Sequence, residues 1–380
     1  MSTQLPPLGL YIHLPWCERK CPYCDFNSHE RHDLPEQAYI DALLRDLEGE
    51  LPRLQGRSVS TLFIGGGTPS LFSAGAIARL MSGIAERLPL EADLEATMEA
   101  NPGSAEAEKF AGFRAAGINR LSLGIQSFEN EQLSALGRVH SAEQAYAAIG
   151  MARAAGFDNF NIDLMHGLPG GTREQAAKDL RQALGYEPPH LSWYQLTIEP
   201  NTVFHKRPPL LPVEDTLADI QEAGESLLRE GGLDSYEVSA WSQPGRECRH
   251  NLNYWSFGDY LAIGAGAHGK ATHANGRIER YAKRRQPDDY LAAAAGGFEV
   301  GQRWLDESEL PGEYMLNTLR LAGGAPLANF PRYTGLDTAV IQPTLDSLCE
   351  RGLVELTSDR RVRCTVVGWR FLDSVVGEFF

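Results

Sequence analysis

The chain lacks the long apolar runs of membrane proteins, and it has few basic residues for its length. No apolar run reaches the roughly 20 residues of a bilayer-spanning helix. Residues Met1–Pro7 show neither the basic segment nor the apolar core of a secretory signal. The 35 Lys and Arg residues face 50 Asp and Glu residues, and the net charge of −15 disfavours a nucleic-acid or anionic-membrane surface. We therefore expect a cytoplasmic protein that does not bind nucleic acid.

Cysteine is also scarce, and its placement indicates a metal site rather than a disulfide framework. Three of the six cysteines, Cys17, Cys21 and Cys24, stand at the spacing C-x3-C-x2-C after an apolar, strand-like run. Three thiolates can hold three irons of a four-iron cube and leave the fourth iron open to the amine and carboxylate of S-adenosylmethionine (SAM). From the spacing alone, zinc bound with His13 or His29, or reduced thiols without a metal, remain alternatives.

Strand-like runs alternate with helix-like segments over the first 230 residues. The expected strands are Leu8–Leu14, Ser60–Ile64, Leu94–Glu99, Arg120–Ile125, Phe160–Met165 and Leu191–Ile198. The expected helices lie near Pro35–Leu51, Ala74–Leu88, Ala105–Ala116, Ala142–Ala155, Arg173–Leu184 and Thr216–Arg229. This alternation predicts an α/β fold with a parallel sheet, curled by right-handed crossovers into a partial (β/α)6 barrel.

Glycine-rich and polar segments follow the expected strands, at the end where barrels build their sites. Gly65-Gly-Gly-Thr-Pro69 ends the second strand, and its bare backbone would let a ligand approach closely, although a tight turn is the simpler alternative. Four polar side chains occupy similar positions: Glu99, Gln126, Arg138 and Asp163. Their positions alone are equally consistent with binding and structural roles.

The alternation ends after Glu230. A strand-like Tyr236–Trp241 leads to Cys248-Arg-His-Asn-Leu-Asn-Tyr-Trp255 and then to the glycine-dense Tyr260–Gly269. The order from about Glu307 onward is helix, helix, strand, strand, helix, which resembles a winged-helix-like α+β domain. We expect a barrel over residues 1–235, a connecting segment over 236–300 and the winged-helix-like domain over 301–380.

The motifs together resemble a known family. The cysteine motif with Tyr11 and Tyr23 resembles the radical SAM signature, and the glycine motif resembles the one that grips the methionine amino group. From Tyr11 onward the chain resembles the oxygen-independent coproporphyrinogen oxidase-like radical SAM family, and most closely its heme chaperone branch, HemW. Phe26 stands where the dehydrogenase branch has an additional cysteine, Cys17 comes without a long preceding extension, and His250–Trp255 matches the heme-binding branch.

The resemblance implies site residues at one end of the barrel. Cys17, Cys21 and Cys24 would ligate a [4Fe–4S] cluster. The positions that match contacts to cluster-bound SAM are Tyr11, Tyr23, Gly66 and Glu99. The positions that match the surroundings of a second SAM in the dehydrogenase branch are Gly67, Thr68, Gln126, Arg138 and Asp163.

The resemblance also implies a heme contact in the segment Cys248–Trp255. His250 is the expected contact to heme iron, with Cys248 as the alternative, because imidazole and thiolate are common axial ligands. Tyr254 and Trp255 would pack on the porphyrin. The structural alternative is a loop beside the barrel in which His250 only makes local hydrogen bonds.

Two functions follow from the resemblance. The first is a heme chaperone with a radical SAM core that passes heme to acceptor hemoproteins. Membrane-associated respiratory enzymes are a candidate class of acceptors, and an electron donor for the cluster is a further expected partner. The second is an enzyme that decarboxylates the propionates of coproporphyrinogen III. The branch-specific motifs favour the first function.

Overall fold

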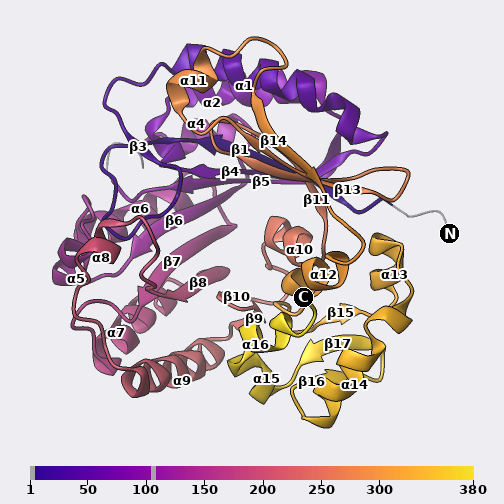
Figure 1. The fold of residues 1–380 in the computed structure, drawn as a ribbon. Helices are drawn as coiled ribbons and strands as arrows, with labels where there is room; N and C mark the ends of the chain where they lie inside the picture. The colour runs from indigo at the N-terminus through magenta and orange to yellow at the C-terminus, as the bar shows by residue number, and fades with distance from the viewer. Residues whose placement is uncertain (1–4, 104–107) are drawn as a thin grey trace.

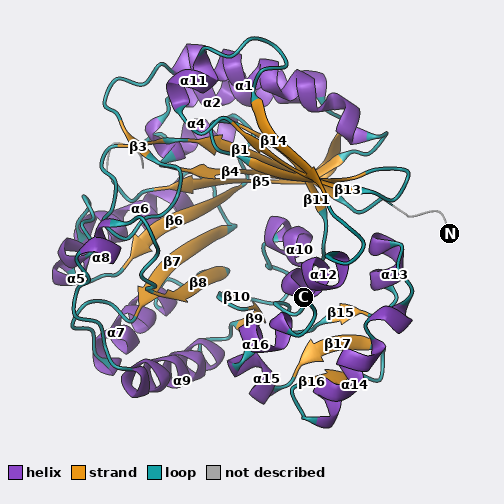
Figure 2. Ribbon diagram, viewed as in Figure 1, coloured by secondary structure: helices purple, strands orange, loops and turns teal. Residues whose placement is uncertain are grey.

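A single curved sheet organises the molecule (Figures 1 and 2). The computed structural model describes residues 5–103 and 108–380. Within them, twelve strands form the sheet in the order β14-β13-β12-β11-β1-β4-β5-β6-β7-β8-β10-β9. The strands from β11 to β8 run parallel, and antiparallel strands continue the sheet on both sides.

The predicted α/β partial barrel is confirmed. Its strands are β1 (Leu8–Leu14), β4 (Val59–Gly66), β5 (Leu90–Ala100), β6 (Arg120–Gln126), β7 (Phe160–His166) and β8 (His190–Gln195). Its helices are α1 (Glu36–Glu50), α2 (Ala74–Arg87), α4 (Phe110–Ala115), α5 (Asn130–Ala135), α6 (Ala142–Ala154), α7 (Arg173–Leu184), α8 (Val203–Lys206) and α9 (Glu214–Glu230). The first residues of the helix expected at Ala105–Ala116 lie outside the described residues.

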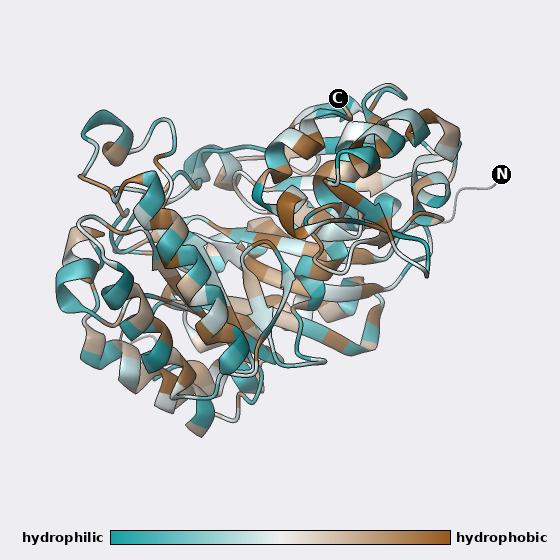
Figure 3. Cartoon of the chain, turned by 90° about the horizontal axis from the view of Figure 1, so that it is seen from below, coloured by the Kyte–Doolittle hydropathy of each residue, from teal (hydrophilic) through white to brown (hydrophobic). Residues whose placement is uncertain are grey.

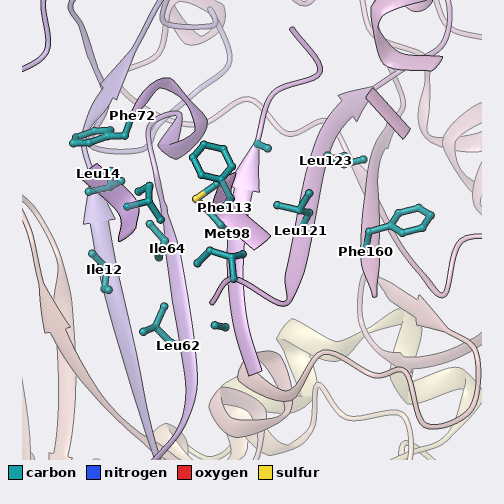
Figure 4. Packing of buried hydrophobic residues seen from close by; sticks show 14 of the residues in the cluster. Ile12, Leu14, Leu62, Ile64, Phe72, Met98, Phe113, Leu121, Leu123 and Phe160 are labelled. Carbon is teal, nitrogen blue, oxygen red and sulfur yellow. The ribbon is translucent and has the colours of Figure 1, made fainter. Parts of the chain in front are cut away.

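The two faces of the barrel strands have different characters because neighbouring side chains on a strand point to opposite faces. On the outer face, Ile12, Ile64, Met98 and Leu121 pack with Phe113 of α4 in the main hydrophobic core (Figure 4). The covering helices are amphipathic, with hydrophilic and hydrophobic residues on different sides (Figure 3). The concave face is largely polar: Glu95, Thr97, Glu99, Arg120, Ser122, Asn161, Asp163, His190 and Ser192.

The segment after α9 contributes more to the sheet than the sequence indicated. It supplies β9 (Asp234–Glu237), β10 (Ala240–Ser242), α10 (Arg249–Trp255), β11 (Asp259–Ile263), β12 (His268–Thr272), β13 (Ile278–Lys283), α11 (Pro287–Leu291) and β14 (Glu299–Trp304). β11 pairs in parallel with β1, so that Tyr11 lies opposite Ala262. The sheet therefore runs across the expected boundaries at 235 and 300, and the division into domains stays a prediction.

The C-terminal residues share a second hydrophobic core with Phe257 and Ile278. The elements are α12 (Leu310–Thr318), β15 (Ala325–Pro326), α13 (Asn329–Thr334), α14 (Gln342–Glu350), β16 (Val354–Leu356), β17 (Arg361–Cys364), α15 (Val366–Arg370) and α16 (Leu372–Gly377). The predicted helices and strands are present, but β15 and α13 come between the first two helices and the chain ends in two helices instead of one. Helix α10 lies on the concave side of the main sheet, beside these elements, where it contacts β1, β4, β11 and α12 (Figure 1). Among the described residues, no helix is long and apolar enough to cross a membrane.

A buried ionic network fixes α1 to the antiparallel part of the sheet. Lys283 of β13 donates to Asp46 Oδ1 at 2.7 Å and to Glu50 Oε1 at 2.5 Å. Tyr290 donates to Asp46, and Tyr281 donates to Glu50. The side chains of Lys283, Asp46 and Glu50 are at most 3% exposed. Lys283 is the cation paired with Asp46, and it shares Glu50 with Arg53, whose Nη1 lies 3.0 Å from Glu50 Oε1.

We predict that Lys283→Met lowers the free energy of unfolding by about 3–5 kcal/mol, because it leaves Asp46 buried without its cation and Glu50 with Arg53 only. The control is Arg79→Ala, which removes an ion pair to Asp41 whose side chains are 42% and 48% exposed. That change should cost about 0–1 kcal/mol. Denaturant unfolding of both variants measures the difference, and equal costs would contradict the assigned role of Lys283.

Candidate functional site

The three clustered cysteines lie in one loop at the carboxyl end of β1. Cys17 belongs to the short strand β2 (Trp16–Cys17), which pairs in parallel with β3 (His29–Glu30). Cys21 and Cys24 follow in a turn that is closed by a hydrogen bond from Cys24 N to Cys21 O, at 3.1 Å. The loop therefore stands where the parallel strands of a barrel present their functional groups.

Each cysteine sulfur has a polar partner from a different part of the molecule. The partners are Thr68 Oγ1 for Cys17 (3.4 Å), Arg138 Nη1 for Cys21 (3.5 Å) and Ser28 Oγ for Cys24 (3.6 Å). Hydrogen bonds and positive charge at the sulfurs stabilise thiolates and tune the potential of an iron–sulfur cluster. The donor set therefore fits such a cluster.

The spread of the three sulfurs fits a cluster better than a single zinc ion. Among the described residues, only Glu95, Cys248 and His250 offer three ligand atoms within 4.8 Å of one another. The three cysteines of the loop are thus spread more widely than the ligands of one tetrahedral ion, whereas the corners of a four-iron cube require such a spread. His13 is no obvious fourth ligand, because both its ring nitrogens are engaged, one by Tyr11 OH and one by a backbone carbonyl.

A chain of hydrogen bonds connects two of the sulfurs through Asn101. Thr68 donates to Cys17, Asn101 Nδ2 donates to Thr68 Oγ1 at 3.2 Å, and Arg138 Nη2 donates to Asn101 Oδ1 at 2.6 Å while its Nη1 reaches Cys21. Asn101 was not among the predicted site residues, although its position just after a barrel strand was a usable signal. Arg138 is half-buried, so its charge acts on the sulfurs with less solvent screening than at an exposed position.

The glycines at the end of β4 leave room for neighbouring protein atoms, and not only for a ligand. Gly66 has φ +115, and a Cβ there would lie 2.5 Å from the His13 ring. A Cβ on Gly67 would lie 2.5 Å from the carbonyl oxygen of Trp16. Gly67 N also donates to Leu14 O at 2.8 Å. The glycine segment is therefore pressed against the cysteine loop itself, a reason that the sequence interpretation did not include.

Two predicted carboxyl groups lie inside the barrel next to the glycine segment. Glu99 Oε2 accepts a hydrogen bond from Gly66 N at 3.1 Å. Burial, reinforced by the charge of Asp163, raises the pKa of Glu99 to about 8. Burial also raises the pKa of Asp163, which accepts hydrogen bonds from Ser122 at 2.8 Å and Asn161 at 2.7 Å. Glu99 therefore holds a proton at neutral pH and can donate as well as accept a hydrogen bond.

The remaining predicted residues on this side surround the same space. Tyr11 OH is bonded to His13 Nδ1 at 2.8 Å, and Tyr23 packs on a small apolar cluster beside the cysteine loop. Gln126 Oε1 accepts from Tyr194 OH at 2.7 Å, and its φ of +68 is unusual for a residue with a side chain. The structure thus brings the predicted cysteine, tyrosine, glycine and polar residues to one end of the barrel.

The predicted heme segment is a helix, not a loop, and its histidine is buried. Only 6% of His250 is exposed, and its ring stacks on Phe63 with centroids 4.3 Å apart. Cys248 Sγ lies 3.0 Å from His250 Nδ1, and Glu95 Oε1 lies 3.4 Å from the same nitrogen. Burial would raise the pKa of Glu95, but the hydrogen bond with His250 and the charge of Arg120 lower it to about 2. Glu95 was not predicted from the sequence.

A polar chain joins this helix to the carboxylates near the glycine segment. Asp163 accepts from Asn161, whose Oδ1 is hydrogen-bonded to His190 Nδ1 at 2.7 Å. His190 Nε2 is bonded to Tyr236 OH at 2.8 Å, and Asn251 of α10 donates to the same hydroxyl at 3.2 Å. The concave face therefore contains continuous hydrogen bonding from Asp163 to α10.

Comparisons with known proteins agree with this geometry. Residues 11–183 match the model of the radical SAM superfamily. The chain is 50% identical over 378 residues to the heme chaperone HemW of Escherichia coli strain K12, covering 99% of both chains. It is 33% identical to the heme chaperone HemW of Bacillus subtilis strain 168, covering 97% and 98% of the two chains. The structure of coproporphyrinogen III oxidase (HemN) from Escherichia coli, a radical SAM enzyme, has the same fold, with a TM-score of 0.84, 24% identity and coverage of 99% and 90%.

We predict that alanine at Cys17, Cys21 and Cys24 together abolishes the iron–sulfur absorption of anaerobically prepared protein, because a cube needs these thiolates. Cys349→Ala is the matched control, since Cys349 is an exposed cysteine of α14. Iron, sulfide and zinc analyses accompany the spectra. Stoichiometric zinc without iron or sulfide in the unaltered protein would contradict a cluster.

We also predict that Gly67→Ala lowers the cluster content, because the new Cβ would push the glycine segment away from Trp16 and displace Thr68 from Cys17. The control is Gly75→Ala on α2, where a Cβ meets no atom within 4 Å. Iron per chain after identical reconstitution is the measurement. Full iron content in Gly67→Ala would show that this close contact does not position the cysteine loop.

Proposed function

This chain belongs to the heme chaperone HemW family within the radical SAM superfamily, and we propose that it binds heme and delivers it to acceptor hemoproteins. The observation that carries the proposal is the identity of about one half to a named heme chaperone over nearly the entire length. Phe26, in place of the additional cysteine of the dehydrogenase branch, supports the same assignment. We propose membrane-associated respiratory enzymes as a candidate class of acceptors, and a separate electron donor for the cluster.

Family membership implies a [4Fe–4S] cluster and SAM as cofactors. When bound, a SAM-ligated cluster supplies one-electron cleavage of SAM. We propose that Cys17, Cys21 and Cys24 hold the cluster. The residues proposed to contact SAM are Tyr11, Tyr23, Gly66, Gly67, Thr68, Glu99, Gln126, Arg138 and Asp163.

The chain's own side chains prepare this end of the barrel in three ways. Thr68 and Arg138 donate hydrogen bonds to the sulfurs of Cys17 and Cys21. The buried position of Glu99 keeps its carboxyl protonated near neutral pH, so that it can donate to a ribose oxygen. Gln126 is held by Tyr194 in a fixed orientation. These contacts fix the side chains that would orient a ligand at this end of the barrel.

We propose His250 as the contact to heme iron, with Cys248 as the alternative. The neutral imidazole is the form that binds iron, and burial lowers the pKa of His250. The ring is covered in the structure by Phe63 and Glu95, so heme reaches it only when α10 moves away from β4 and β5. Heme binding at His250 is therefore coupled to opening of α10.

We predict that His250→Ala weakens heme binding roughly tenfold or more and changes the Soret spectrum, while the cluster content stays unchanged. His268→Ala, a change at a largely exposed histidine of β12, is the control. The rate of heme association should level off at high heme concentration, because opening of α10 becomes limiting. Unaltered affinity and spectrum in His250→Ala would exclude His250 and move the proposed contact to Cys248.

A transfer assay tests the chaperone function itself. Heme-loaded protein should pass heme to an apo-hemoprotein, and the same preparation with SAM, reductant and coproporphyrinogen III should form no decarboxylated product. Turnover of coproporphyrinogen III without heme transfer would instead establish the dehydrogenase function.

A further inference from the structure

We propose that Glu95, Cys248 and His250 form a binding site for a divalent cation of the zinc class, separate from the cysteine loop. Glu95 lies on β5 four positions before Glu99, which is roughly 13 Å along a strand, and therefore toward the opposite end of the barrel. Cys248 precedes the first residue of α10, and His250 lies in its first turn. None of these residues belongs to the cluster motif.

The distances between the three ligand atoms suit one small ion. Cys248 Sγ is 3.0 Å from His250 Nδ1 and 3.8 Å from Glu95 Oε1, and Nδ1 is 3.4 Å from Oε1. Zinc binds sulfur at about 2.3 Å and nitrogen or oxygen at about 2.0–2.2 Å, so its tetrahedral ligands stand roughly 3.3–3.7 Å apart. Cys248 Sγ also lies 3.4 Å from His250 Nε2, over the ring, so the imidazole must turn for Nδ1 to face an ion that the sulfur and Glu95 share.

The chemistry of the three donors favours a zinc-class ion over calcium or magnesium. Thiolate and imidazole are soft or borderline ligands, whereas calcium and magnesium take oxygen ligands. A thiolate and a carboxylate together balance the charge of a divalent ion, and the buried Arg120 beside them adds one further positive charge. With three protein ligands, the fourth coordination position is open to water.

The surroundings hold the ligands in place, as the outer contacts of metal sites do. Phe63 stacks on the His250 ring, and His250 N donates to Glu95 Oε1 at 3.2 Å. Cys248 N donates to Tyr236 OH at 3.3 Å. All three ligands are buried, at 6%, 1% and 6% exposure for Glu95, Cys248 and His250, so an ion would be shielded from solvent.

A cation at this position would fasten α10 to β5 and occupy His250. The cation and heme iron would then exclude one another at this imidazole. The metal site does not depend on the proposed heme contact, because its three ligand atoms lie together while α10 is packed on the sheet.

The test is metal analysis and zinc K-edge X-ray absorption of the full-length, cluster-loaded protein, purified anaerobically from cells supplied with zinc. We expect one zinc per chain with one sulfur ligand at about 2.3 Å and the remaining nitrogen or oxygen ligands at about 2.0–2.2 Å. Cys248→Ser and Glu95→Gln should each lose most of the zinc and keep their iron. Cys364→Ser, which changes a buried thiol of β17, is the control and should keep both metals.

Three results would overturn the inference. The first is the absence of zinc from the unaltered protein. The second is zinc with three sulfur ligands, which would place the ion in the cysteine loop. The third is full retention of zinc in Cys248→Ser. The sulfur count in the unaltered protein decides the question even if a variant folds poorly. Heme affinity is measured in a separate experiment. If heme does not bind at His250, a zinc ion with one sulfur ligand would still support the metal site.

Discussion

The site depends on how closely three loops can approach one another at the carboxyl ends of β4, β1 and β11. Gly67 lies against the Trp16 carbonyl on one side of the cysteine loop, and on the other side a Cβ at Gly264 would lie 2.3 Å from His13 O. Asn27 donates to the carbonyls of Ala265 and Arg285 in the same region. Because glycine alone fits these contacts, the cysteines are positioned by backbone packing from both neighbouring strands.

Much of the fold could be predicted because each barrel strand is an apolar run followed by a distinct turn or polar cluster. Parallel β11 could not be predicted in the same way. Its partner β1 lies about 250 positions earlier in the chain. In the sequence alone, the glycines that follow β11 indicate a ligand-binding loop and give no sign of the pairing with β1. Helix α10 was also missed, since Asn251, Asn253 and the aromatic residues have low helix propensity and the helix is held by packing on β1 and β4.

In the candidate site, too, the residues that belong to a local sequence pattern could be predicted, and those defined by long-range contacts could not. The spacing of Cys17, Cys21 and Cys24 indicates a metal site, and the resemblance to the radical SAM signature makes a cluster the predicted occupant. The position of Asn101 just after a barrel strand was a usable signal, but its partners Thr68 and Arg138 appear only when β5 is placed beside its neighbours. The partner of Glu95, His250, appears in the same way. The polar concave face follows from two-residue alternation, but which polar groups meet there depends on the register of the strands.

The parallel pairing of β1 with β11 also has a consequence for biosynthesis. Asn27 is joined to Ala265 and Arg285 across 238 and 258 positions of the chain. A ribosome adding roughly 5–20 residues per second needs on the order of 10–50 s to make the chain between them. Throughout that interval the cysteine loop lacks these later partners, so the side that β11 and its loop afterwards close stays uncovered.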